Sequence, residues 1–166
     1  TEGCNIMKKI INDPVNFVDE TMDGIVAAYG DRVQFLDGDR RVLLSAYPKK
    51  EGKVGIVTGG GSGHLPLFLG YVGSGMVDAC VVGNVFASPS YTKMAAAIRA
   101  VDQGAGVLCL YGHYGGDKMN FDGFFQNAGP DFLHQHDAED RMDMPRRSAG
   151  IGANFVERDF FVELFG

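Results

Sequence analysis

Three apolar runs of the sequence each end at a glycine-rich or polar loop, and this alternation constrains the fold more than any other feature. The runs are KVGIVT, VDACVVG and GVLCLYG, at residues 53–58, 77–83 and 106–112. Continuous apolar runs of this length are typical of strands buried on both faces of a parallel sheet. RVLLSAY, at residues 41–47, reads as a further strand. Because helical patterns separate the strands, the sequence predicts an α/β domain with a mostly parallel sheet flanked by helices.

The first helical pattern covers residues 12–30. Its apolar side chains recur at positions 15, 18, 22, 25 and 26, which is the period of one helix face. We expect Asn12 or Asp13 to cap this helix, Pro14 to lie in its first turn and Gly30 to end it.

A second helical pattern covers residues 87–104, with apolar positions at 94, 97, 98 and 101. Here Ser88 is the expected cap, Pro89 the first helical residue and Gly104 the stop. A shorter helix, begun by Pro66, is expected at residues 65–73. The last segment, from about Gly123, has no sustained period, although NFVERDFFVELF can form a strand or a short helix.

Charge and hydropathy exclude several classes of protein. The net charge is −6 and the sequence contains no basic stripe, which argues against a nucleic-acid partner. The apolar runs are much shorter than the roughly 20 residues that a membrane span needs, and no positively charged leader opens the chain. Cys4, Cys80 and Cys109 offer no closely spaced pair of zinc ligands, and two of them lie in apolar runs. We therefore expect reduced thiols, no metal and a cytoplasmic protein.

Glycine is over-represented, with 24 of 166 residues, about twice the usual share of 7%. The loops TGGGSGH, GNVFASPS and GHYGGDKMNFD each follow a predicted strand directly. At the carboxyl ends of parallel strands such loops lie side by side, where open α/β sheets bind ligands. The sequence thus predicts a ligand site at this edge of the sheet.

The loop Gly61, Ser62, Gly63, His64 lacks the lysine of a phosphate-binding loop and the third glycine of a dinucleotide fingerprint. What remains is a backbone that a small polar ligand can approach, or a tight turn from strand to helix. His64 is either a general acid or base or a surface histidine.

Asp117, in the third loop, either accepts a proton or hydrogen bond from a hydroxyl group or caps the next helix. Asn120 and Asp122 have the same ambiguity, and Lys118 is either a phosphate contact or a solvated side chain. The other histidines, His113, His134 and His136, are weaker candidates.

Three stretches taken together resemble the amino-terminal half of the dihydroxyacetone kinase substrate-binding subunit or domain. They are MKKIINDPVNFVDETMDGIVAAY, GIVTGGGSGHLPLFLGYVGSGMVDACVVGNVFASPS and YGHYGGDKMNFD, and the resemblance covers about residues 7–122. It implies phosphoryl transfer to the terminal hydroxyl of dihydroxyacetone or a similar ketose such as erythrulose.

The resemblance also implies the roles of individual residues. Gly61, Ser62, Gly63 and His64 would line the substrate pocket, and His64 and Asp117 would bind the substrate hydroxyls and support proton removal. This chain itself would bind no cofactor. ATP with Mg²⁺, or a phosphoprotein of the phosphotransferase system, would belong to a helical partner domain or subunit, and the chain would form a homodimer.

The sequence departs from the family in three places. Gly112 stands where some members carry a lysine, Leu65 stands where a glutamate is common, and residues 123–166 are not matched. No motif after Phe121 matches the family's histidine that binds the substrate carbonyl covalently, and residues 1–6 are expected to be a tag or extension. The alternative hypothesis is therefore a ketose-binding or protein-interaction module without catalysis.

Overall fold

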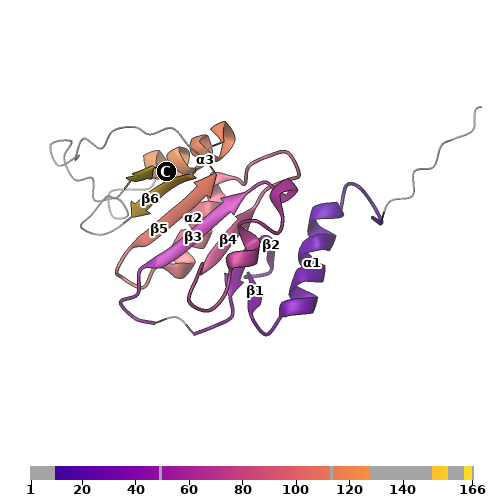
Figure 1. Ribbon diagram of the computed structural model, residues 1–166, viewed down its shortest axis with the longest axis horizontal. Coiled ribbons are helices and arrows are strands. Elements are labelled where there is room, and N and C mark those ends of the chain that lie inside the picture. Colours follow the sequence, from indigo (N-terminus) through magenta and orange to yellow (C-terminus); the bar gives the residue numbers. More distant parts are fainter. Residues whose placement is uncertain (1–9, 49, 113, 128–150, 157–162, 166) are drawn as a thin grey trace, which may run out of the picture.

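The computed structural model describes residues 10–48, 50–112, 114–127, 151–156 and 163–165, the last two segments and residues 124–127 by their backbone alone. These residues form a seven-stranded sheet in the order β1-β2-β4-β3-β5-β6-β7, shown in Figure 1. The strands are β1 (Val33–Leu36), β2 (Asp39–Ser45), β3 (Gly55–Gly60), β4 (Ala79–Val82), β5 (Val107–Gly112), β6 (Ile151–Val156) and β7 (Glu163–Phe165). The helices are α1 (Phe17–Tyr29), α2 (Tyr91–Val101) and α3 (Gly115–Asn127), with short 3₁₀ turns η1 (Ser62–His64) and η2 (Leu69–Tyr71).

The centre of the sheet is parallel, because β3 pairs with β4 on one side and with β5 on the other in the parallel sense. The predicted α/β fold is therefore confirmed. Every outer pairing is antiparallel, between β1 and β2, β2 and β4, β5 and β6, and β6 and β7. The hairpin of β1 and β2 turns at Asp37 and Gly38, both with positive φ, as a two-residue hairpin loop requires.

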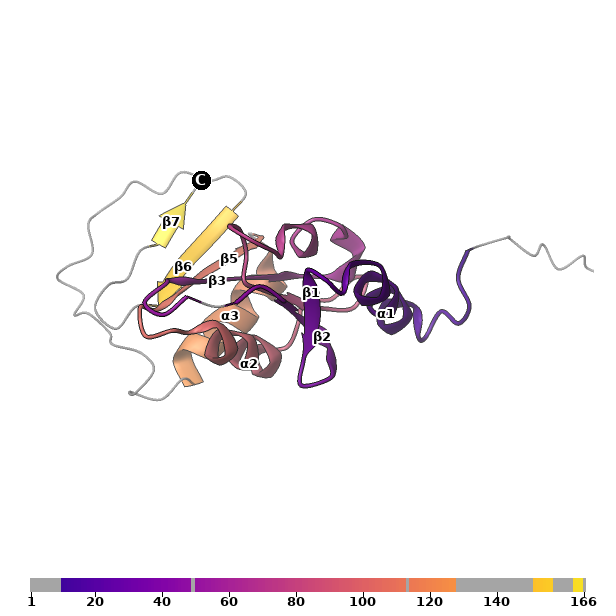
Figure 2. The same cartoon turned by 90° about the horizontal axis from the view of Figure 1, so that it is seen from below.

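Both faces of the sheet are covered, as Figure 2 shows for α2 and α3 on one side. Alternate residues of one strand point to opposite faces. Val81 packs in the cluster beneath α2 and α3, and its neighbour Cys80 packs in the cluster that contains α1 and η2. The thiols of Cys80 and Cys109 are free and buried, and this burial raises the pKa of both.

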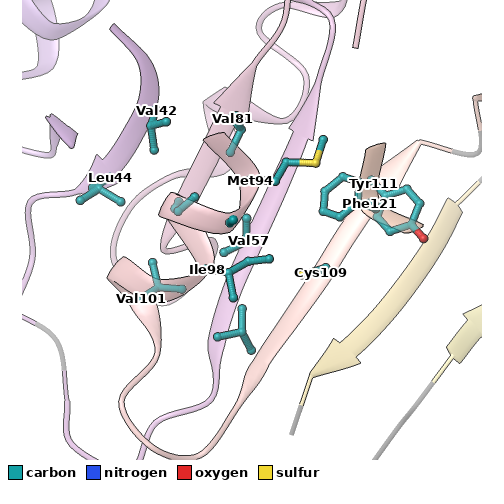
Figure 3. Packing of buried hydrophobic residues seen from close by; sticks show 14 residues of the cluster. Val42, Leu44, Val57, Val81, Met94, Ile98, Val101, Cys109, Tyr111 and Phe121 are labelled. Atoms are coloured by element: carbon teal, nitrogen blue, oxygen red, sulfur yellow. The ribbon is translucent and has the colours of Figure 1, made fainter. Parts of the chain in front are cut away.

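Helix α3 is held against β5 by a pair of stacked rings (Figure 3). Tyr111 of β5 and Phe121 of α3 have ring centroids 4.0 Å apart and planes inclined by 10°. Phe121 is completely buried. Because Phe121 lies about one turn after Asp117, this contact fixes the first turns of α3 at the carboxyl end of the sheet.

Three predicted helix starts are wrong. Helix α1 begins at Phe17, because the side chain of Asp13 accepts the amide of Val15 in a turn before the helix. Helix α2 begins at Tyr91 with Ser90, not Ser88, at its N-cap. The segment after the glycine loop contains the 3₁₀ turn η2 instead of a helix begun by Pro66.

The structure tests some of the remaining expectations about the first helix and the two terminal segments. Gly30 directly follows α1, as predicted. The strand alternative holds for residues 151–156 and 163–165 of the last segment. Residues 1–6, with Cys4, lie outside the described residues. In the part of the chain that the structure describes, no helix has the length and apolar character of a membrane span.

Replacing Gly24 by alanine is expected to stabilise the protein by about 0.5–1 kcal/mol. Gly24 lies inside α1 and is exposed, and a Cβ built there meets no atom within 4 Å. The gain therefore comes from the lower conformational freedom of the unfolded chain. Urea unfolding measures it, and an unchanged or lower midpoint would contradict the expectation.

Candidate functional site

The three glycine-rich loops meet at the carboxyl edge of the sheet. Residues 61–64 follow β3, residues 83–90 follow β4, and Tyr114, after β5, directly precedes α3. Hydrogen bonds join the first two loops, since the amides of Ser62 and Gly63 donate to the carbonyl oxygens of Asn84 and Val85 over 3.1 and 3.2 Å. The ring of Tyr114 packs against His64 and brings the third loop to the same edge, so the predicted convergence of the three loops is confirmed.

Most amides of the glycine loop are already used inside the protein. Besides Ser62 and Gly63, the amide of His64 donates to the Gly61 carbonyl oxygen. The amide of Gly61 has no hydrogen-bond partner among the described residues. A nest of free amides for a phosphate group is therefore missing from residues 61–64, where only the Gly61 amide is unbonded in the described structure.

Two glycines allow the loops to approach this closely. A Cβ at Gly63 would collide with the carbonyl oxygen of Val85, and one at Gly83 would collide with the carbonyl oxygen of Ala87. A Cβ at Gly61 would lie 3.1 Å from the carbonyl oxygen of Asn84. The glycines thus serve backbone packing between the two loops.

Asp117 is the third residue of α3, so it is not the N-cap of that helix. Its side chain is buried, with 2% of its surface exposed, and Oδ1 has no hydrogen-bond partner. Burial raises the pKa of the Asp117 carboxyl, while a hydrogen bond with Ser88 and the nearby imidazole of His64 act in the opposite direction. A carboxylate in this setting is a competent proton acceptor with one free oxygen.

His64 lies at the end of η1, exposed to solvent and flanked by two aromatic rings. The ring of Tyr114 is 5.2 Å from the imidazole with the planes inclined by 34°, and the ring of Phe68 meets it edge-on at 5.9 Å. These contacts hold the imidazole between the rings of Phe68 and Tyr114, next to the start of α3.

The hydroxyl group of Ser62 is the second buried polar atom without a partner. In the part of the chain with described side chains, Ser62 Oγ and Asp117 Oδ1 are the buried side-chain polar atoms that make no hydrogen bond. Both belong to the predicted site. Buried polar groups are nearly always paired, so two unpaired oxygens at one sheet edge mark this edge as the candidate site.

The remaining sequence candidates lie elsewhere. The Asn120 amide donates to the Gly116 carbonyl oxygen of its own helix, and Lys118 and Asp122 are exposed on α3. His113, His134 and His136 lie outside the described residues. No group of three or more metal-binding side chains occurs among the residues searched, which are those that the structure describes.

Sequence reasoning missed Ser88 and Tyr114 as parts of the site. Ser88 looked like a helix cap, yet its hydroxyl group contacts Asp117. Tyr114 packs against His64, and the absence of a side chain at Gly112 makes room for its ring, because a Cβ there would lie 3.0 Å from that ring. Both residues lie in the predicted loops, so the loop boundaries were the available signal.

The sequence of this chain is similar to those of known dihydroxyacetone and erythrulose kinases and their subunits. The family model of the Dak1 domain matches residues 23–131, which is more than half of the chain. The dihydroxyacetone-binding subunit DhaK of the PTS-dependent dihydroxyacetone kinase 2 of Listeria innocua is 50% identical over 116 residues, covering 70% of this chain and 35% of that subunit. The D-erythrulose kinase of Mycolicibacterium smegmatis is 44% identical over 115 residues, covering 69% of this chain and 19% of that enzyme.

Solved structures agree. The dihydroxyacetone kinase of C. freundii, crystallised with AMP-PNP and Mg²⁺, superposes with a TM-score of 0.66 at 33% identity, over 73% of this chain and 23% of that one. The dihydroxyacetone kinase operon co-activator Dha-DhaQ superposes with a TM-score of 0.60 at 35% identity, over 66% of this chain and 33% of that one. The chain spans about a third of the Listeria subunit and less of the longer kinases. On its sequence and its fold, the chain belongs to the Dak1 domain family.

Proposed function

We propose that this chain is the substrate-binding component of a ketose kinase, which positions dihydroxyacetone or a similar short ketose for phosphorylation of its terminal hydroxyl group. The observation that carries the proposal is the pair of buried, unpartnered oxygens, Ser62 Oγ and Asp117 Oδ1, beside the glycine loop. A polyhydroxy ketone brings both hydroxyl donors and oxygen acceptors. It therefore satisfies an acceptor-only carboxylate and a serine hydroxyl at once.

Each site residue then has a role. Asp117 accepts a hydrogen bond from the hydroxyl group that will attack, and its raised pKa makes it a stronger base than an ordinary aspartate. The imidazole of His64 assists removal of that proton and contacts a second hydroxyl group. The amide of Gly61 and the hydroxyl group of Ser62 bind the substrate oxygens, and Gly63 supplies a surface without a side chain. As the proton passes to Asp117, the substrate oxygen would form a bond to the phosphorus atom of the donor, and the bond from that phosphorus to the donor's leaving group would break.

The phosphoryl donor belongs to a partner in this proposal. The described residues fit a nucleotide and Mg²⁺ poorly, because the amides of Ser62, Gly63 and His64 are occupied and no metal-binding cluster is found among them. ATP with Mg²⁺ or a phosphoprotein of the phosphotransferase system would be carried by a helical domain or subunit, and the chain would form a homodimer. The buried free thiols of Cys80 and Cys109 fit a reducing compartment such as the cytoplasm.

Replacing His64 by glutamine is expected to weaken dihydroxyacetone binding about 5- to 10-fold, because one hydrogen bond to the ligand is lost or misaligned. Titration of the ¹⁵N-labelled chain with dihydroxyacetone, followed by NMR, measures this. Asn120→Ala is the matched control, since the Asn120 amide is bonded within α3. Equal affinity of wild type and His64→Gln would remove His64 from the site.

A ketose-binding module without catalysis is the second candidate. It is favoured by the structural match to a protein described as an operon co-activator and by the glycine at position 112. An assay that supplies the helical nucleotide-binding subunit and ATP distinguishes the two. Binding of dihydroxyacetone without formation of its phosphate favours the module, and binding of ATP to the chain alone argues against both.

A further inference from the structure

Arg41 of β2 links the first helix to the loop that follows β4. Its Nε donates to Asp19 Oδ1 of α1 over 2.7 Å. Its NH1 group donates to the Gly83 carbonyl oxygen over 3.1 Å and to Asn84 Oδ1 over 3.0 Å. The Arg41 side chain is mostly buried, with 20% of its surface exposed. One guanidinium group therefore joins α1, β2 and residues 83–90.

The same two loop residues hold the glycine loop. The carbonyl oxygen of Asn84 accepts the Ser62 amide over 3.1 Å, and the Gly83 amide donates to the Gly60 carbonyl oxygen over 2.9 Å. Arg41 thus binds the side chain of Asn84 and the carbonyl group of Gly83. The carbonyl oxygen of Asn84 and the amide of Gly83 in turn bind the start of the glycine loop. A continuous set of hydrogen bonds runs from Asp19 to Ser62.

We propose that Arg41 is a positioning residue for the ketose site, acting through Gly83 and Asn84 on the glycine loop that carries Ser62 and His64. This inference rests on the proposed function only for the identity of the ligand. The hydrogen bonds that would transmit the effect are those of the protein itself, so the conformational part is testable without any ketose.

The chemistry of the guanidinium group suits this role. It is permanently charged, and its N–H groups point in fixed directions, so it holds a carboxylate and two neutral acceptors at once. A lysine has one ammonium group on a flexible stem and cannot reproduce this spacing.

Arg40 is a natural control. It precedes Arg41 and pairs with Asp23 of the same helix at 2.9 Å, with 54% and 42% of the two side chains exposed. No hydrogen bond from Arg40 to residues 83–90 occurs in the described structure. A variant at Arg40 therefore loses a tether to α1 and a positive charge, as a variant at Arg41 does, but keeps the connection to the glycine loop.

The test compares Arg41→Gln, Arg40→Gln and wild type by amide hydrogen exchange read out residue by residue with NMR. In Arg41→Gln, we expect exchange at the Ser62 and Gly63 amides to become about 10-fold faster, the effect of weakening one hydrogen-bonded loop contact. In Arg40→Gln, exchange at these amides stays at the wild-type rate. Amides of β5 report any general loss of stability, and their change is subtracted.

A second variant keeps the test decisive if Arg41→Gln folds poorly. Asn84→Ala removes the side-chain acceptor and leaves the contacts of Arg41 with Asp19 and with the Gly83 carbonyl group in place. Faster exchange at Ser62 and Gly63 is expected here too, by about 3-fold. Unchanged exchange at both amides in Asn84→Ala, or in a folded Arg41→Gln, would overturn the proposal.

Ligand binding supplies the functional readout. The affinity of Arg41→Gln for dihydroxyacetone is expected to fall about 10-fold, and that of Arg40→Gln by less than 2-fold. If wild type binds no ketose, the proposed function fails while the exchange rates still decide the role of Arg41. If wild type binds ketose and Arg41→Gln binds equally well, the positioning role is wrong and the proposed function stands.

Discussion

Replacing Asp117 by asparagine is expected to lower phosphoryl transfer to dihydroxyacetone by about 10²-fold or more, the usual contribution of a positioned general base. The amide cannot take a proton from the attacking hydroxyl group, although it nearly preserves the shape of the side chain. The measurement is formation of the ketose phosphate in the presence of the nucleotide-binding partner and ATP. If the chain acts only as a binding module, weaker dihydroxyacetone binding is the remaining expected effect.

The same substitution is expected to stabilise the protein at neutral pH. The pKa of Asp117 is raised in the folded state, so in the range above the unfolded pKa of 3.8 the folded chain holds a proton that the unfolded chain releases. Stability is therefore lost as the pH rises through the folded pKa. Asparagine carries no charge, and the gain is on the order of 1 kcal/mol at pH 7.

Urea unfolding of wild type and Asp117→Asn between pH 3.5 and pH 8 measures this difference, which should disappear at the acid end. Asp122→Asn is the matched control, because Asp122 is an exposed aspartate of the same helix. An equal or lower stability of Asp117→Asn at pH 7 would show that its carboxylate is well solvated or paired. Unchanged phosphoryl transfer would remove Asp117 from the chemistry.

Replacing Gly83 by alanine is expected to destabilise the protein by about 3 kcal/mol, at the upper end of the cost of overpacking. The new Cβ would collide with the carbonyl oxygen of Ala87 and lie 2.7 Å from the carbonyl carbon of Ser88 and 2.8 Å from the nitrogen of Pro89. These are backbone atoms, so no rotamer change relieves the contact. Residues 83–90 must move, and the acceptors of the Ser62 and Gly63 amides move with them.

Urea unfolding and NMR titration with dihydroxyacetone test this prediction together, and ketose binding should be lost along with stability. Gly70→Ala is the control, since a Cβ at Gly70 meets its nearest atom at 3.6 Å and should cost little. A Gly83→Ala variant with wild-type stability would mean that the loop after β4 adjusts freely. The close packing of the two loops would then be unnecessary for the fold.

The order of the central elements follows from patterns in the sequence. The apolar runs that became β3, β4 and β5 are continuous and sit between helical segments, which already favours a parallel sheet. The first hairpin was not predicted, although Asp37 and Gly38 give a recognisable turn signal. The helix starts failed because Asp13 and Ser88 have side chains that suit a cap, and their actual partners are Val15 and Asp117.

Some residues of the candidate site could be recognised in the sequence, and others only in the structure. Gly61, Ser62, Gly63, His64 and Asp117 stand out in the sequence because glycine and polar residues directly follow apolar runs. Their roles in binding and catalysis remain proposals. Arg41 carries no such mark, and Ser88 and Tyr114 are marked only by lying in the predicted loops. Their contacts join segments far apart in the chain, and local patterns do not report such pairs.

The sequence by itself determined the α/β class, the three loops and the residue types of the candidate site, since backbone propensity and apolar periodicity are local properties. Only the tertiary structure decided which amides of the glycine loop stay open, that Asp117 is buried with a free oxygen, and that Arg41 holds the loop after β4. These depend on burial and on hydrogen-bond partners from other strands and helices. Burial sets the cost of an unpaired charge, and burial exists only once the chain has folded.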